Sequence, residues 1–169
     1  MRAALDRLYD AAAYLAALFL VGTLLCVLAG IASRVLEWFV PGTDAYAGYC
    51  MAAAGFLALA HTLKRGEHIR VSLVLERLAG AARHRMELFA LALTAALAAS
   101  FAYYSVRLAY QSWSFNDIST GNDATPLWLP QIAMALGTVV LFVAVVDELV
   151  LEWQGKRRVV VPEEALHNE

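Results

Sequence analysis

Four long stretches of this chain contain no Asp, Glu, Lys or Arg and consist mostly of apolar residues. They are Ala11–Ser33, Ala45–Leu63, Leu88–Val106 and Ala124–Val146, with lengths of 23, 19, 19 and 23 residues. A helix rises about 1.5 Å per residue, so each stretch can form a helix of about 28–35 Å, the thickness of a bilayer's hydrocarbon core. The pattern predicts an all-α integral membrane protein with four spans, at about residues 11–35, 45–64, 86–108 and 126–149.

The composition excludes a soluble domain. Hydrophobic residues make up 61% of the chain and charged residues 17%, against about 45–50% and 25% in soluble domains. A net charge of −2 gives no sign of nucleic-acid binding.

The first apolar stretch could instead be a secretory signal peptide, because it follows the basic residues Arg2 and Arg7 and contains Gly30-Ile31-Ala32, which resembles a cleavage site. However, its 23 residues exceed the usual apolar core of about 7–15 residues. We therefore expect it to remain as a span.

The basic residues predict the orientation. Eleven of the 13 Lys and Arg residues flank the spans on one side, which leaves Arg34 and Arg107 on the other. The positive-inside rule therefore places both termini and the middle loop in the cytoplasm. The predicted outer ends of the spans also carry Trp38, Trp113 and Trp128, which is typical of the headgroup region.

One further segment is predicted to lie along the membrane surface. Over about residues 69–80, Val71, Val74, Leu75 and Leu78 follow the i, i+3, i+4, i+7 spacing of one helical face, which indicates an amphipathic interfacial helix. Near the N-terminus, Leu5, Leu8, Tyr9 and Ala12 repeat this spacing more weakly, and this segment could equally extend the first span. Residues 1–155 are predicted to form one membrane domain, and residues 156–169 a cytoplasmic tail.

Few residues suggest chemistry within the spans. His61 is the one His in a predicted span, and a four-helix redox or cofactor-binding subunit using it is the alternative function. Cys26 and Cys50 are expected at different depths, so no disulfide is predicted. No cofactor site is predicted, because His68, His84 and His167 all lie outside the spans and cannot pair with His61. No metal site is predicted, because the acidic loop that starts at Asp117 has Asn122 where a calcium loop has Gly and Trp128 where it has Glu.

Local patterns also indicate how the helices pack and begin. Small residues four apart, as in Gly48/Ala52 and Ala98/Ala102, allow close helix approach. Thr125 is predicted to cap the fourth helix, with Pro126 at its first position.

Three features carry a family resemblance. Gly66-x-His68-Ile69-x-Val71, Thr125-Pro126-x-x-x-Pro130-Gln131 and an outer Arg34 are similar to motifs of the small membrane subunits of TRAP (tripartite ATP-independent periplasmic) transporters, the DctQ-like family. Many members carry a Trp-x-Glu-Glu stretch before the second span. This chain has Gly42-Thr43-Asp44-Ala45-Tyr46 there, with Asp44 as the replacement acid.

The resemblance implies a non-enzymatic scaffold subunit in the bacterial inner membrane. Its transporter would be sodium-coupled and would import organic anions, such as a C4-dicarboxylate or related carboxylate. A large DctM-like elevator subunit would hold the sodium and substrate sites, and a DctP-like periplasmic protein would deliver the substrate.

Two sets of residues are candidates for contacts with these partners. Cations near the inner leaflet each contribute about 1 kcal/mol to lipid binding, and the outer acids could steer the periplasmic protein or merely form a solvated connector. The candidates for contact with the large subunit or lipid are Arg34, Lys64, Arg65, His68, Arg70, Val74, Leu78 and Trp128. The candidates for docking the periplasmic protein are Asp44, Asp117 and Asp123.

Overall fold

The computed structural model describes residues 2–38, 40–65 and 80–155. Within them it has four α-helices: α1 Arg2–Val35, α2 Thr43–Lys64, α4 Gly80–Ser114 and α5 Trp128–Trp153. Each helix is long and apolar enough to cross a membrane. The predicted all-α fold with four membrane-length helices is therefore confirmed.

The helices extend beyond the charge-free stretches. α1 begins at Arg2 and continues without interruption, so the segment from Leu5 to Ala12 extends the first span and does not form a separate surface helix. α4 has 35 residues, which corresponds to a length of about 52 Å. The predicted interfacial helix at 69–80, with Val74 and Leu78, falls almost entirely outside the described residues. His68, Arg70 and the tail 156–169 also lie outside them.

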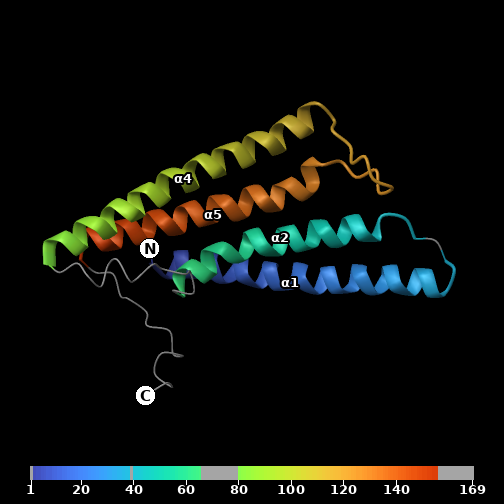
Figure 1. The fold of residues 1–169 in the computed structure, drawn as a ribbon, viewed down its shortest axis with the longest axis horizontal. Helices are drawn as coiled ribbons and strands as arrows, with labels where there is room; N and C mark the ends of the chain where they lie inside the picture. Colours follow the sequence, from blue (N-terminus) through green and yellow to red (C-terminus); the bar gives the residue numbers. More distant parts are fainter. Residues whose placement is uncertain (1, 39, 66–79, 156–169) are drawn as a thin grey trace, which may run out of the picture.

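The four helices form two antiparallel hairpins, α1–α2 and α4–α5, which contact each other mainly through α2 and α5. The resulting row has the order α1, α2, α5, α4 (Figure 1). We call the end with the N-terminus the terminal end, and the end with residues 36–42 and 115–127 the loop end. The two outer helices α1 and α4 spread apart toward the loop end, and α4 and α5 continue past the end of α2 at the terminal end (Figure 1).

Small residues bring the two hairpins into contact. A Cβ atom on Gly137 of α5 would lie 2.5 Å from both the carbonyl carbon and the oxygen of Phe56 in α2, so the two backbones touch there. In α4, Ala98 and Ala102 are buried, as their spacing predicts. The Gly48/Ala52 pair is different, because both residues are exposed and nothing lies within 4 Å of a Cβ on Gly48. Within the described part of the chain this pair therefore does not contribute to the packing of the four helices.

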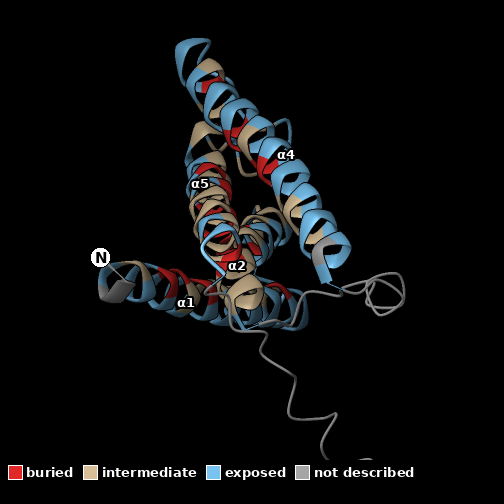
Figure 2. Ribbon diagram, turned by 90° about the vertical axis from the view of Figure 1, so that its left-hand side faces the viewer, coloured by how far each residue is buried: buried red, intermediate tan, exposed pale blue. Residues whose placement is uncertain are grey.

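The remaining helix faces carry large exposed apolar side chains. They are frequent on α1 and α4, the two outer helices of the row, where Figure 2 shows mostly exposed residues. Contact of such apolar faces with water is unfavourable, whereas lipid or another membrane protein can cover them. The fold is therefore suited to a bilayer and leaves broad surfaces for neighbours.

Candidate functional site

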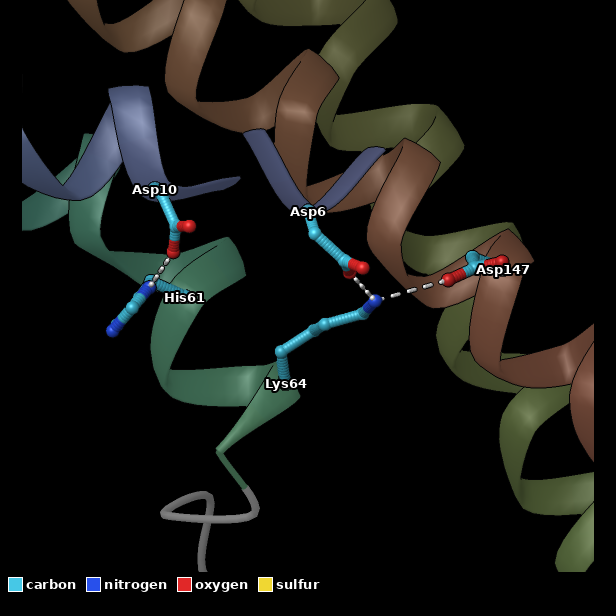
Figure 3. A network of polar contacts seen from close by, with 5 residues as sticks. All are labelled: Asp6, Asp10, His61, Lys64 and Asp147. Atoms are coloured by element: carbon cyan, nitrogen blue, oxygen red, sulfur yellow. Dashed lines mark hydrogen bonds and ion pairs between the residues drawn. The ribbon is translucent and has the colours of Figure 1, made fainter. Parts of the chain in front are cut away.

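A network of charged residues joins three helices at the terminal end (Figure 3). Lys64, the last residue of α2, places its Nζ atom 2.6 Å from Oδ1 of Asp6 in α1 and 3.6 Å from Oδ2 of Asp147 in α5. Lys64 thus bridges the two hairpins. We call Asp6, Lys64 and Asp147 the lysine bridge.

The lysine bridge rests on a tightly packed apolar cluster. Tyr9 of α1, Ala60 of α2 and Ala144 of α5 are each at most 1% exposed and pack together. The ammonium of Lys64 lies 4.9 Å from the centre of the Tyr9 ring, within range of a cation–π interaction. The bridge is partly shielded from solvent, since the side chain of Asp147 is 14% exposed and that of Lys64 is 25% exposed. Shielding strengthens the attraction between the charges and also makes an unpaired charge costly.

His61 lies one turn before Lys64 and contacts α1. Its Nδ1 atom is 3.7 Å from Oδ1 of Asp10, so the imidazole faces a carboxylate of the neighbouring helix. His84 in α4 is engaged elsewhere, because its Nδ1 lies 2.9 Å from Oε1 of Glu152 in α5. Both histidines therefore take part in contacts between helices within each hairpin.

A second polar cluster links the hairpins at the loop end. Asp123 accepts hydrogen bonds from the Ser119 hydroxyl (2.8 Å) and from the hydroxyl of Tyr49 in α2 (3.0 Å). Thr125 donates its hydroxyl to the Tyr46 oxygen at 3.2 Å. We call Tyr46, Tyr49, Ser119, Asp123 and Thr125 the loop clasp, because residues of the α4–α5 loop here hold the start of α2.

Electrostatics and close packing support the loop clasp. Desolvation alone would raise the pKa of Asp123, but hydrogen bonds from Thr125, Ser119 and Tyr49 outweigh it and lower this pKa from 3.8 to about 2. Gly42, which precedes α2, has φ +80°, and a Cβ there would lie 2.7 Å from Cβ of Asp123. A side chain at position 42 would therefore strain the backbone and push the loop away.

The predicted docking acids have different environments. Asp44 forms an ion pair with Arg34 at 3.3 Å, and both side chains are more than three-quarters exposed, so the pair contributes at most about 1 kcal/mol to stability. These two residues line a hollow of about 420 Å³ together with Gly121 and Asn122. Asp117 is exposed, whereas Asp123 belongs to the loop clasp.

The structure also places the predicted lipid or large-subunit contacts that it describes. Lys64 belongs to the lysine bridge, and Arg65 is exposed as the C-terminal cap of α2. Trp128 is the first residue of α5, whose N-cap is Leu127 without a side-chain cap. The prediction that Thr125 caps this helix is therefore wrong, because its hydroxyl bonds to Tyr46 instead.

A further correction concerns the two cysteines. Cys26 and Cys50 are free, but Cys50 faces α1 one turn before Cys26, since its Sγ atom would lie 3.3 Å from a Cβ on Gly22. The expectation of different depths is wrong. It counted Cys50 from the outer end of its span, and it did not allow for α1 continuing past the level at which α2 begins.

Sequence reasoning missed the partners that complete both clusters. Asp147 is the first residue after the fourth charge-free stretch, and Lys64 is the first after the second. Both residues are predicted at the cytoplasmic ends of their spans. Their opposite charges at the same side of the membrane could therefore have indicated an ion pair. Nothing in the sequence indicated that Tyr49 would reach Asp123, 74 positions away.

A comparison with protein families gives one finding and a comparison with curated proteins gives none. The chain matches a family model described as "Tripartite ATP-independent periplasmic transporters, DctQ component" over residues 23–155. No curated protein matches the chain. The matched range includes the loop clasp, Lys64 and Asp147, but it begins after Asp6 and Asp10.

Proposed function

This chain belongs to the DctQ family, the small membrane component of TRAP transporters, and from this premise we propose that it is a static scaffold. In the proposed role it supports a large DctM-like subunit that moves substrate as an elevator. The chain itself then holds no transported ion or substrate and needs no cofactor. Sodium and the substrate, an organic anion such as a C4-dicarboxylate or related carboxylate, bind to the large subunit.

One observation carries this proposal: the two hairpins are fastened to each other at both ends. The lysine bridge ties α1 and α2 to α5 at the terminal end, and the loop clasp ties α2 to the α4–α5 loop at the other. Between them the backbones touch at Gly137 and Phe56. A subunit that moved its hairpins during transport would have to break polar contacts at each end, whereas a scaffold benefits from all of them.

The surroundings of the scaffold follow from the same chemistry. The exposed apolar faces of α1 and α4 offer area to lipid and to the large subunit. The distribution of basic residues supports an orientation with both termini in the cytoplasm and, for a TRAP component, a place in the bacterial inner membrane. The loop end then faces the periplasm.

We propose in addition that the loop end helps dock the DctP-like binding protein. Asp117 is exposed at the loop end, and its carboxylate makes no hydrogen bond or ion pair within the part of the chain that the structure describes, whereas Asp44 pairs with Arg34 and Asp123 is held in the loop clasp. An exposed acid can raise the association rate with a basic patch without being needed for assembly. Asp117→Lys should therefore slow uptake at limiting binding protein and weaken its salt dependence.

Reconstitution tests the scaffold role directly. The chain is placed in proteoliposomes with the large subunit encoded beside it and the binding protein, and uptake of labelled organic anions is measured with and without a sodium gradient. The proposal expects uptake that needs all three proteins and the gradient. Uptake by the chain alone, or full uptake without it, would contradict a supporting role.

For the docking proposal, Asp117→Asn serves as the matched control for the charge reversal Asp117→Lys, because it removes the acid without adding a cation.

A further inference from the structure

An exposed cation of α4 lies where this helix leaves the apolar part of the membrane. Arg107 is the first charged residue after the charge-free stretch Leu88–Val106, which places it near the membrane boundary at the loop end. Its side chain makes no ion pair or hydrogen bond within residues 2–38, 40–65 and 80–155. The other basic residue predicted on this side, Arg34, is paired with Asp44. Arg107 is therefore an unpaired cation on the side that the positive-inside rule leaves poor in cations.

Arg107 lies on the face of α4 that points away from the other helices. Successive residues of an α-helix are about 100° apart, so Arg107 is about 200° from Ser105 and about 180° from Ala98. Both of these residues are buried, and Ala98 packs with Val145 of α5, the neighbour of α4 in the row. Arg107 itself is exposed. Its side of the helix therefore faces the surroundings of the bundle, which are lipid or a partner protein.

Tyrosines flank Arg107 on the same face. Tyr103 is four residues before it and Tyr110 three residues after it, so the Cβ atoms of both lie about 5–6 Å from that of Arg107. Both tyrosine side chains are more than 60% exposed. The Tyr103 ring contacts Tyr104 with ring centres 5.3 Å apart, and the Tyr110 ring contacts Trp113 with ring centres 6.0 Å apart. Arg107 thus lies between two aromatic pairs along the helix, a composition typical of the headgroup region.

Towards the middle of the membrane, the same face of α4 is apolar. Ala96 and Ser100 lie about 20° to either side of the direction of Arg107, and both are exposed. The hydroxyl of Ser100 donates to the carbonyl oxygen of Ala96 at 3.0 Å, so it needs no partner in the lipid. Phe89 lies farther along this face and is 64% exposed. We call Phe89, Ala96 and Ser100 the apolar strip.

We propose that Arg107, Tyr103 and Tyr110 bind the phosphate of a phospholipid in the leaflet at the loop end, with the acyl chains along the apolar strip. The guanidinium suits a phosphate because its planar donors bind two oxygens at once, and the tyrosine hydroxyls add a donor on each side. A carboxylate of a partner protein would match the cation alone. A phospholipid matches the cation, its depth at the membrane boundary and the apolar strip. This inference requires only that the helices cross a membrane, so its failure would leave the scaffold role intact.

Native mass spectrometry of the full chain, alone and in complex with its large subunit, tests the site. The probes are phosphatidylglycerol and diacylglycerol with identical acyl chains, which differ in the phosphate-bearing head group. Arg107→Gln should weaken the binding of one phosphatidylglycerol about fivefold, the effect of one cation at a membrane surface, and leave diacylglycerol binding unchanged. Leu108→Gln is the matched control, because Leu108 is also exposed at the same depth but about 100° around the helix. This control should bind phosphatidylglycerol like the wild type.

A second variant tests the two tyrosines. Tyr103→Phe combined with Tyr110→Phe keeps both rings and removes both hydroxyls, so it should weaken phosphatidylglycerol binding about two- to tenfold. The proposal is overturned if either site variant binds phosphatidylglycerol like the wild type, or if Leu108→Gln weakens binding as much as Arg107→Gln. It is also overturned if the chain alone binds this lipid and the complex does not, since a residue of the large subunit then occupies Arg107.

Discussion

Replacing Lys64 by methionine should destabilise the protein more than any other single loss of charge at the terminal end. Methionine keeps most of the length and the apolar stem of lysine but removes the ammonium that contacts Asp6 and Asp147. The two acids respond differently. Asp6 is 54% exposed and can be solvated by water, whereas Asp147 is 14% exposed and its Oδ2 atom is buried without a hydrogen-bond partner in the described part of the chain.

The expected magnitude follows from this difference. Removing one partner of a buried ion pair costs about 3–5 kcal/mol, and an exposed pair contributes about 0–1 kcal/mol. Asp147 lies near the first case and Asp6 near the second, so Lys64→Met should cost about 2–4 kcal/mol. For a protein of this size, this corresponds to a fall in Tm of about 4–16 °C. The double variant Lys64→Met, Asp147→Leu leaves no unpaired buried charge and should recover most of the loss.

Thermal unfolding of the detergent-solubilised protein, followed by circular dichroism, provides the measurement. Arg7→Met is the control, because Arg7 is an exposed cation on the first turns of α1 next to Asp6, and it should change stability by less than about 0.5 kcal/mol. The reasoning is refuted if Lys64→Met is as mild as the control. It is equally refuted if adding Asp147→Leu lowers Tm further, since the cost would then lie in lost packing and not in an unpaired charge.

Three further predictions concern other contacts. Folding lowers the pKa of Asp123 from 3.8 to about 2, so the contribution of Asp123 to stability is complete above a pH of about 4 and disappears as the pH falls through about 2. Asp123→Asn should therefore flatten the decline of Tm over that pH range. An unchanged decline would contradict the loop clasp. Gly137→Ala places a Cβ against the Phe56 backbone and should lower the stability by about 1–3 kcal/mol. In the control Gly48→Ala, the added Cβ meets nothing within 4 Å, so this change should be neutral or stabilising. Equal effects of the two variants on Tm would show that α2 and α5 are not in close contact. His61→Gln should keep substantial uptake in proteoliposomes and the same visible absorption spectrum, because His61 contacts Asp10; loss of a Soret band would instead support the alternative cofactor-binding function.

The four helices could be predicted because a bilayer imposes its thickness on the sequence. A span must be apolar for about 20 residues, so the charge-free stretches located all four, and the small residues Ala98 and Ala102 marked a packed face. Helix ends were less predictable. α1 and α4 extend well past the apolar stretches, because a helix outside the bilayer needs only good helix formers and contacts with its neighbour.

The polar clusters could not be predicted with the same rules. Lys64 and Asp147 lie just beyond the charge-free stretches, so the pattern that marks the apolar spans does not mark these two residues as a partly buried pair. Their pairing depends on how far one hairpin is displaced along the other, which hydrophobicity does not specify. Thr125 shows a similar limit. Its sequence context fits a helix cap, but the loop continues to Trp128 and turns its hydroxyl toward Tyr46.

The distance between the two hairpins during transport is the most direct test of the scaffold account. Spin labels at Ile31→Cys on α1 and Tyr110→Cys on α4, both exposed positions toward the loop end, can be introduced after Cys26→Ala and Cys50→Ala remove the native thiols. Pulsed electron paramagnetic resonance then gives the label distance in the reconstituted complex, before and after addition of sodium and substrate-loaded binding protein. The account predicts one unchanged distance distribution. A shift of about one helical turn, roughly 5 Å, would contradict it and show that this subunit moves during transport.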